Sequence, residues 1–134
     1  MYVTTKEMLR AAQAGKYAIG AFNCENMEMA MAIVAAAEAQ HAPVMLQNTP
    51  STVSYAGLDV YYANVRALAE RASVPVALHL DHGSSYQLAI DAMAAGYSSV
   101  MIDGSHETFE DNIAVTRRVV EQAKAKDSRE TMAT

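Results

Sequence analysis

The sequence has 134 residues, of which 51% are hydrophobic and 19% are charged, and its formal net charge is −5. This apolar content excludes a disordered chain, and the length predicts one globular domain. The acidic balance and the absence of a basic run argue against nucleic acid and anionic membranes as partners. No apolar stretch approaches the roughly 20 residues of a membrane-spanning helix, and the first residues lack the apolar segment of a secretory signal. Because Cys24 is the only cysteine, it has no internal disulfide partner. From the nine methionines and the ordinary pI of about 5.2 we expect a cytoplasmic protein.

The first predicted element is a short helix. Thr4 and Glu7 have the spacing of a capping box, and Gly15 is a stop signal. Beyond it, short apolar runs alternate with segments whose apolar residues recur at i, i+3, i+4 and i+7, the period of one helix face. The runs predict strands over residues 17–23, 43–48, 74–82 and 99–103. Helices are expected between the strands and after the last one, including a helix over residues 58–72 that follows a loop at residues 49–52.

This alternation amounts to four βα units. Near-continuous apolar strands indicate burial on both faces, as in a parallel sheet covered by helices. Eight units of this length would approach the ~250 residues of a (β/α)8 barrel, and this sequence carries four of them. The predicted fold class is therefore α/β, either half of such a barrel or a small open sheet. We assign residues 1–126 to the βα units and expect the polar residues 127–134 to form a frayed tail.

Every predicted strand ends in polar residues. These are Asn23, Gln47 and Asn48, Asp81 and His82, and Asp103. In α/β barrels and open α/β sheets, the carboxyl ends of the parallel strands form the edge where ligands bind. We therefore expect the polar strand ends to lie together at one edge of the sheet.

The sequence His79-Leu80-Asp81-His82-Gly83, at the end of the third predicted strand, carries the strongest chemical signal. An imidazole there can hold a Zn²⁺ that polarises a carbonyl, and an adjacent carboxylate can move a proton. The alternative is a hydrogen-bonded pair that caps the following helix. A catalytic zinc usually has three protein ligands, so this spacing alone does not complete a metal site. His79 lies on the same side of the strand as Asp81, and we expect it to position its neighbours.

The other candidate residues carry weaker signals. Asp103 could bind a cation, contact a substrate or cap a helix, and His106 fits a loop better than a ligand role. His41, at a helix–strand junction, is interpreted as structural. Cys24 lies just beyond the first strand, and a small buried side chain is the preferred interpretation. The sequence contains no glycine-rich dinucleotide or phosphate-loop motif.

Four stretches of the sequence, taken in order, carry a family resemblance. They are Ala-Phe-Asn at 21–23, Val-Met-Leu-Gln-Asn-Thr-Pro at 44–50, Val-Ala-Leu-His-Leu-Asp-His at 76–82, and Met-Ile-Asp-Gly-Ser-His at 101–106. With these motifs the sequence resembles the class II, zinc-dependent ketose-bisphosphate aldolases, in particular the tagatose- and fructose-bisphosphate aldolase branch. The last two stretches are the more specific ones. The resemblance runs from about residue 2 to residue 126 and covers the N-terminal half of a family member.

The resemblance implies a (β/α)8 barrel that reversibly cleaves a ketose 1,6-bisphosphate into dihydroxyacetone phosphate and glyceraldehyde 3-phosphate. It implies that Asp81 exchanges a proton with the hydroxyl at the bond being broken. It also implies that His82 is one of three protein ligands to a Zn²⁺ cofactor. It places Asn23 and Thr49 at strand ends near the substrate. Asp103 matches a carboxylate that some members link to a second metal position.

The resemblance also implies which parts of the family site lie outside these 134 residues. Two further zinc histidines, the glutamate that abstracts the dihydroxyacetone phosphate proton and the phosphate-binding loops belong to later strands. We therefore expect a truncated aldolase that binds zinc weakly and is inactive alone. The expected partners are a sugar bisphosphate in the parent enzyme and either a second copy of the chain or a complementary half. Two alternatives are a non-catalytic half-barrel assembly subunit and a small open-sheet module that binds sugar phosphates.

Overall fold

The computed structural model describes the backbone of residues 1–132 and the side chains of residues 1–127. Its centre is a four-stranded parallel sheet in which the strands follow one another in sequence order. The strands are β1 (Gly20–Asn23), β2 (Val44–Asn48), β3 (Val76–Gly83) and β4 (Ser99–Ile102). Helices connect successive strands, as parallel pairing requires. The predicted α/β class and the predicted parallel order are confirmed.

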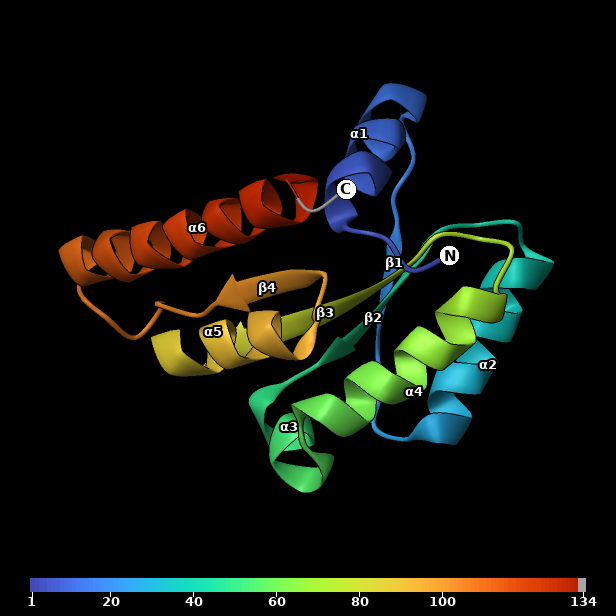
Figure 1. Cartoon of the computed structure of the whole chain (residues 1–134), viewed down its shortest axis with the longest axis horizontal. Helices are drawn as coiled ribbons and strands as arrows, with labels where there is room; N and C mark the ends of the chain where they lie inside the picture. The colour runs from blue at the N-terminus through green and yellow to red at the C-terminus, as the bar shows by residue number, and fades with distance from the viewer. Residues whose placement is uncertain (133–134) are drawn as a thin grey trace.

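Six helices accompany the sheet in the described part of the chain. They are α1 (Thr5–Gly15), α2 (Met27–Ala39), α3 (Pro50–Ala56), α4 (Leu58–Arg71), α5 (Tyr86–Ala95) and α6 (Phe109–Met132). In Figure 1, α2, α4 and α5 form a row along the sheet, α6 packs beside α5, and α2 and α6 occupy opposite ends of the arrangement. Within residues 1–132, no helix is both long enough and apolar enough to span a membrane.

The hydrophobic core lies between the sheet and the row of helices. Alternate residues of the two central strands point into it and are almost fully buried, namely Val44, Leu46, Val76, Leu78 and Leu80. Small and branched helix residues meet them, among them Ala30, Val34, Val65, Ala69 and Ala92. Because successive side chains of a strand point to opposite faces, Gln47 and His79 belong to the other face of the sheet. These two residues pair in register, so they form one row across that face.

A short helix occupies part of the segment predicted as a loop. The sequence predicts a loop at residues 49–52, whereas α3 begins at Pro50 with Thr49 as its N-cap residue. Proline suits the first helical turn because its fixed φ matches the helix and its missing N–H has no partner there. The predicted capping box is wrong in its contacts: the Thr4 side chain makes no cap hydrogen bond, and Glu7 pairs with Arg10.

Two element boundaries also differ from the sequence-based expectation. β1 begins at Gly20 rather than at residue 17, because the chain leaves α1 through a left-handed turn at Lys16 before it joins the sheet. α6 continues through Met132 and so crosses the predicted boundary at residue 126. Residues 133–134 of the predicted tail lie outside the described residues. The division of the chain at residue 126 stays a prediction.

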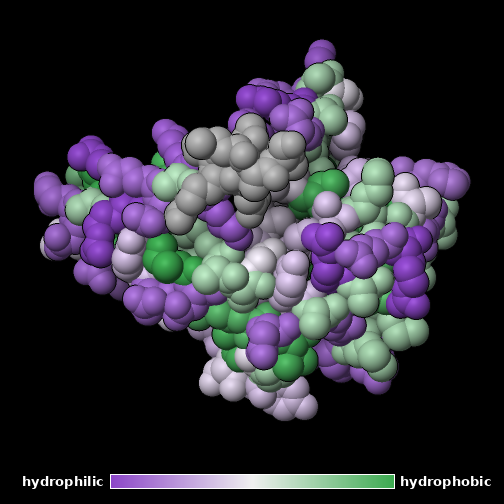
Figure 2. All heavy atoms as spheres, in the orientation of Figure 1, coloured by the Kyte–Doolittle hydropathy of each residue, from purple (hydrophilic) through white to green (hydrophobic). Residues whose placement is uncertain are grey.

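The two edge strands are less buried than predicted. All four residues of β1 are exposed, and Phe22 keeps 52% of its surface accessible. In β4, Met101 is 37% exposed. The central strands have a neighbour on each side, whereas each edge strand has one neighbour in the described sheet. Figure 2 shows further apolar patches over the region of α3 and between α5 and α6.

The pairing of β3 with β4 is irregular at its carboxyl end. The register shifts between Leu80 and Gly83, as at a β-bulge, and His82 has a positive φ of 52°. A Cβ placed on Gly83 would lie 2.6 Å from the carbonyl oxygen of Met101, so only glycine permits this approach. The backbone N–H of Asp103 donates to the Gly83 carbonyl at 2.9 Å. Bulges of this kind re-aim side chains beside functional sites.

We predict that Gly83→Ala lowers the free energy of unfolding by about 1–3 kcal/mol, because the added methyl group meets backbone that cannot move aside. Urea unfolding followed by circular dichroism measures the change. Gly15→Ala is the matched control, since the nearest atoms to its Cβ belong to the exposed Tyr17 ring, which can rotate away. The control should change stability by no more than about 0.5 kcal/mol. Equal losses in both variants would contradict the close approach of β3 to β4.

Candidate active site

The carboxyl ends of the first three strands are joined by one side chain. The Gln47 amide nitrogen donates to Asn23 Oδ1 at 2.7 Å and to Asp81 Oδ2 at 2.9 Å. One amide therefore holds the last residue of β1 and the carboxylate of β3 on the same edge of the sheet. The predicted convergence of polar strand ends is confirmed for these residues. The linking role of Gln47 was not predicted, because the sequence identifies it only as a polar strand end.

The bulge in β3 directs His82 toward the end of β4. The Nδ1 atom of His82 lies 2.8 Å from Asp103 Oδ2. A carboxylate can only accept a hydrogen bond, so Nδ1 carries the proton and Nε2 of the neutral ring is left with its lone pair. The other carboxylate oxygen of Asp103 accepts from the Ser105 backbone N–H at 3.0 Å. Asp103 is thereby fixed by its own loop and in turn fixes the orientation of the imidazole.

Electrostatics couple the three charged groups at this edge. The hydrogen bond to Asp103, followed by the charge of Asp81, raises the pKa of His82 above its ordinary value of 6.5. The same bond, with help from Ser105, holds the pKa of Asp103 well below its usual range. Asp81 Oδ1 lies 3.9 Å from His82 Nε2, beyond hydrogen-bond distance. Asp81 therefore stands beside the imidazole and has one oxygen that is not committed to Gln47.

The His82–Asp103 pair matches one part of a zinc site. Histidines that ligate a metal through one nitrogen usually donate the other N–H to a carboxylate, which fixes the tautomer and the ring orientation. His82 presents Nε2 in this way, and its side chain is 60% exposed. Among the described residues, however, no group of three His, Cys, Asp or Glu side chains is arranged to hold a metal ion. The pair fits a single ligand position, and a complete site needs further ligands.

His79 points to the same face as Asp81 but takes part in different contacts. Its Nδ1 atom lies 2.8 Å from the Ser99 hydroxyl on β4, and burial lowers its pKa. This contact supports the predicted structural role, because it joins the two strands just below the bulge. The structure also places Cys24 as predicted, fully buried in the core.

Thr49 belongs to a second polar cluster at this end of the sheet. Its hydroxyl lies 2.9 Å from the Ser51 hydroxyl and 3.1 Å from the Thr52 hydroxyl. The buried Thr52 hydroxyl lies 2.9 Å from both carboxylate oxygens of Glu25. Glu25 was not identified from the sequence, because it stands in the loop after β1 without a recognisable spacing to other polar residues.

Asn48 is the one predicted polar strand end that faces the core instead of the ligand edge. Its amide nitrogen donates to the Cys24 carbonyl at 2.7 Å, and its Oδ1 accepts from the Tyr97 hydroxyl at 2.7 Å. Adjacent strand residues face opposite sides, so Gln47 and Asn48 cannot both reach the same edge cluster. Asn48 is fully buried and structural.

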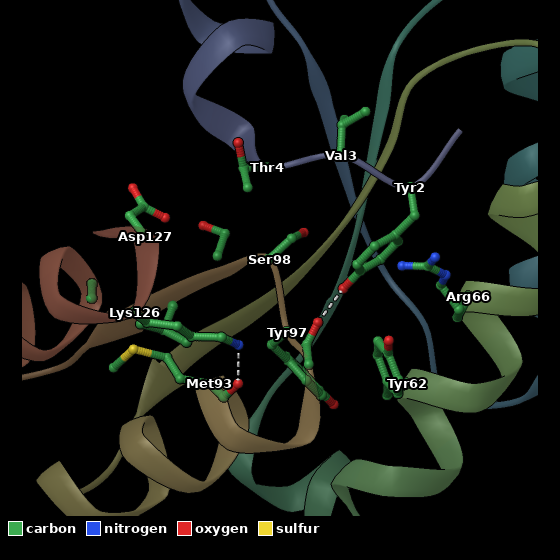
Figure 3. A pocket seen from close by; sticks show the side chains of 14 residues that line it. Tyr2, Val3, Thr4, Tyr62, Arg66, Met93, Tyr97, Ser98, Lys126 and Asp127 are labelled. Carbon is green, nitrogen blue, oxygen red and sulfur yellow. Dashed lines mark hydrogen bonds between the residues drawn. The ribbon is translucent and has the colours of Figure 1, made fainter. Parts of the chain in front are cut away.

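Among the described residues, cavities lie at both ends of the strands. One, of about 430 Å³, adjoins Asp103 and is bordered by Ser85, Glu107 and by Arg118, whose guanidinium lies 4.0 Å from the Tyr86 ring centroid. The other, of about 410 Å³, lies where β4 begins, as Figure 3 shows. Figure 3 shows its wall of tyrosine rings with Arg66 and Lys126 at the sides. In barrels the amino ends of the strands are the stability face, so only the first cavity belongs to the candidate site.

This chain resembles known proteins over most of its length. The family model described as fructose-bisphosphate aldolase class II matches residues 3–129. The chain belongs to the class II fructose-bisphosphate aldolase family. The fructose-bisphosphate aldolase of Thermus caldophilus is 50% identical over 125 residues, which are 93% of this chain and 41% of that protein. The 6-phospho-5-dehydro-2-deoxy-D-gluconate aldolase of Halalkalibacterium halodurans is 44% identical over 93% of this chain and 44% of its own length.

A solved aldolase structure has the same arrangement of strands and helices. The YdjI aldolase of Escherichia coli K12 superposes with a TM-score of 0.89 at 31% sequence identity, over 95% of this chain and 48% of that chain. The chain thus spans less than half the length of the curated relatives and about half of this solved one. The two sequence relatives carry different substrate names, so membership of the family does not by itself assign the substrate.

We predict that, in the metal-free chain, His82 titrates above pH 6.5 and His79 below it, and that Asp103→Asn lowers only the His82 value. Proton NMR of the two imidazoles in the presence of a chelator measures both, and His79 serves as the internal control. A His82 value that is unchanged in Asp103→Asn would contradict the hydrogen bond.

The same pair predicts a pH window for stability. Folding raises the pKa of His82, so the protonated imidazole stabilises the fold at pH values below its pKa in the unfolded chain, near 6.5. This contribution disappears as the pH rises through the pKa of His82 in the folded chain. Folding lowers the pKa of Asp103, so the ionised carboxylate stabilises the fold at pH values above its pKa in the unfolded chain, near 3.8. This contribution disappears as the pH falls through the pKa of Asp103 in the folded chain. The stability difference between wild type and Asp103→Asn should therefore be largest between pH 4 and 6.5 and smaller at pH 8.

Proposed function

We propose that this chain supplies the proton-transfer residue and one zinc ligand of a class II aldolase that cleaves fructose or tagatose 1,6-bisphosphate. The products would be dihydroxyacetone phosphate and glyceraldehyde 3-phosphate. The observation that carries the proposal is the pair of neighbours Asp81 and His82, which stand at one strand end but are held by different partners, Gln47 and Asp103. Family membership supports the reaction class, and the names of the relatives support the type of substrate.

Asp81 is the proposed acid–base group. Gln47 engages Oδ2, so Oδ1 is the oxygen that would exchange a proton with the hydroxyl at the bond being broken. His82 is the proposed zinc ligand through Nε2, with Asp103 as the residue that holds the ring in place. A zinc ion bound there would act as a Lewis acid on the substrate carbonyl. Both carboxylate oxygens of Asp103 already accept hydrogen bonds. This favours a role in positioning the His82 ring over the predicted role at a second metal position.

The remaining site residues would bind and orient the substrate. Asn23 is exposed and held by Gln47, so its amide nitrogen is available to a substrate oxygen. Thr49 sits at the start of α3, where its hydroxyl is tied to the cluster around Glu25. Together they place hydrogen-bonding groups on the first two strands beside the Asp81 carboxylate.

The site proposed here needs residues from outside these 134. One imidazole does not hold a catalytic zinc, and we infer that the chain alone binds zinc weakly and has no appreciable aldolase activity. A second copy of the chain or a chain with the complementary half would be its partner. The exposed edge strand β1 favours, as a second candidate function, a non-catalytic assembly subunit. A cytoplasmic location belongs to the same proposal, because the only cysteine is a buried free thiol.

We predict that co-expression with the part of the Thermus caldophilus aldolase that lies beyond the matched 125 residues produces zinc-dependent cleavage. In that complex, Asp81→Asn should lower turnover by about 100-fold or more and leave zinc bound, since general acid–base catalysis contributes factors of this size. A coupled assay on both ketose bisphosphates measures the rates and separates the two substrates. An active Asp81→Asn complex would remove Asp81 from the mechanism, and robust cleavage by the chain alone would refute the need for outside residues.

We predict further that His82→Ala weakens zinc binding by the complex at least about 100-fold, because a ligand is lost and not merely its orienting partner. Calorimetry with zinc chloride measures the affinity. His41→Asn is the matched control, since His41 lies before β2 at the opposite end of the sheet and its φ of 50° suits asparagine. Equal zinc affinity in His82→Ala and wild type would exclude His82 as a ligand.

A further inference from the structure

A chain of hydroxyl groups runs from the start of α3 to the carboxylate of Glu25. The Ser51 and Thr49 hydroxyl oxygens lie 2.9 Å apart, and the Thr49 and Thr52 hydroxyl oxygens lie 3.1 Å apart. The Thr52 hydroxyl oxygen lies 2.9 Å from each carboxylate oxygen of Glu25. Because each hydroxyl has only one proton to donate, these contacts restrict one another.

The carboxylate fixes the direction of every hydrogen bond in this chain of hydroxyl groups. Glu25 can only accept, so the Thr52 hydroxyl donates its single proton to it. The Thr52 oxygen is then the acceptor in its contact with Thr49, and the Thr49 proton is used in that bond. Ser51 in turn donates to Thr49. If Thr49 donated to Ser51 instead, the lone pairs of Thr49 and Thr52 would face each other at 3.1 Å with no proton between them.

Contacts with the core hold both ends of the bond between Thr52 and Glu25. Thr52 is 2% exposed, so its hydroxyl has little access to water as another partner, and a buried hydroxyl without a partner is costly. The loop that carries Glu25 is also fixed, because its carbonyl accepts from the Tyr61 hydroxyl at 2.9 Å. The preceding carbonyl, of Cys24, accepts from the Asn48 amide at 2.7 Å. The carboxylate is therefore kept where the Thr52 hydroxyl reaches it.

Thr49 is left with one way to contact a ligand. Its proton goes to Thr52, and one of its two lone pairs accepts from Ser51, so only the second lone pair remains. A ligand group that reaches this oxygen must therefore donate a hydrogen bond. A sugar hydroxyl can donate, whereas a fully ionised phosphate can only accept. The negative charge of Glu25, on the far side of the Thr52 hydroxyl, adds like-charge repulsion against a phosphate.

From these contacts we infer that Glu25, acting through Thr52, makes Thr49 an obligatory hydrogen-bond acceptor that selects a hydroxyl group of the substrate. The part of the site beside Thr49 then takes a hydroxyl of the sugar carbon chain and rejects a phosphate, so the phosphates of a ketose bisphosphate bind elsewhere. Glu25 and Thr52 are positioning residues, since neither needs to touch the substrate. The choice of substrate group rests on the proposed function, in which Thr49 contacts the substrate, whereas the direction of the hydrogen bonds does not.

Two variants separate the charge of Glu25 from its role as an acceptor. In Glu25→Gln the amide oxygen still accepts from Thr52 while the negative charge is gone, so the hydrogen bonds should keep their direction. In Glu25→Ala the acceptor is gone as well. The buried Thr52 proton then turns to the Thr49 oxygen, and the Thr49 proton is released toward a ligand. Because Glu25 is exposed, both variants should fold, and circular dichroism melts establish this.

Proton NMR of the 134-residue chain tests the direction of the hydrogen bonds without any activity. A buried hydroxyl proton that is held by a carboxylate exchanges slowly with water and resonates downfield, and isotope-labelled threonine assigns it. We expect the Thr52 hydroxyl proton to be observed in wild type and in Glu25→Gln. In Glu25→Ala its resonance should move upfield and its exchange should become faster. A Thr52 hydroxyl proton that is not observed in wild type, or that does not respond to Glu25→Ala, would overturn the inference.

Steady-state kinetics of the complex with the remaining part of the Thermus caldophilus aldolase test which substrate group meets Thr49. Thr49→Val should raise KM for the ketose bisphosphate about 3- to 10-fold at unchanged kcat, the effect of one lost hydrogen bond in binding. Glu25→Gln is the matched test of charge and should keep the wild-type KM, because the substrate group beside Thr49 is uncharged. A KM that falls in Glu25→Gln would indicate a phosphate beside Thr49 and would overturn the inference.

A double-mutant cycle in the same complex shows whether Glu25 acts through Thr49. Glu25→Ala should raise KM at least about twofold, the lower limit for one hydrogen bond, and should have no effect when Thr49→Val is already present. An equal effect in both backgrounds, or none in either, would overturn the inference. A wild-type complex that cleaves neither ketose bisphosphate refutes the proposed function and the choice of substrate group with it. The NMR result distinguishes that failure from a wrong direction of the hydrogen bonds.

Discussion

The close approach of β3 to β4 at Gly83 is the constraint on which the candidate site depends. A methyl group at this position would lie 2.6 Å from the Met101 carbonyl oxygen, so the two strands meet here only because the side chain is absent. The register shift that accompanies the approach turns His82 out of the strand and into hydrogen-bond distance of Asp103. In a regular strand, alternation would put Asp81 and His82 on opposite faces. The bulge therefore lets two adjacent residues serve one site.

Strain and compensation occur at the same place. A non-glycine residue with positive φ costs about 1–2 kcal/mol, and His82 adopts this conformation at the edge of the sheet. The compensation comes from a charge-assisted hydrogen bond to Asp103, whose loop anchors it through Ser105. Such strain persists where surrounding contacts fix it, and it clusters at functional sites. The imidazole is thus held in one orientation before any ligand arrives, which is what a metal ligand requires.

The spacing of apolar residues predicted most of the fold, because the strands and helices of this chain depend mainly on residues that are close in the sequence. Apolar runs and helical spacing located the four strands, and the polar strand ends predicted which residues would meet at one edge. The same rules missed what depends on contacts across the sheet. Gln47 and Asn48 are adjacent polar residues, and only the pairing of β2 decides that one links the site and the other enters the core. The burial of β1 was overestimated because a strand sequence does not state which of its sides has a neighbour.

The incompleteness of the proposed metal site and the exposure of the edge strands have one physical origin. In a parallel sheet built from βα units, each strand is buried by the helix before it and the helix after it, and each ligand edge is completed by strands on both sides. Phe22 of β1 and Phe109 of α6 lack this cover at the two ends of the row, and the proposed ligand His82 has no companion ligands among the described residues. Whatever pairs with β1 and β4 would therefore bury these exposed side chains and also enclose the candidate site from the remaining sides. Under the proposed function, stability and chemistry would be coupled through the same neighbouring strands, because whatever covers these side chains would also shape the site.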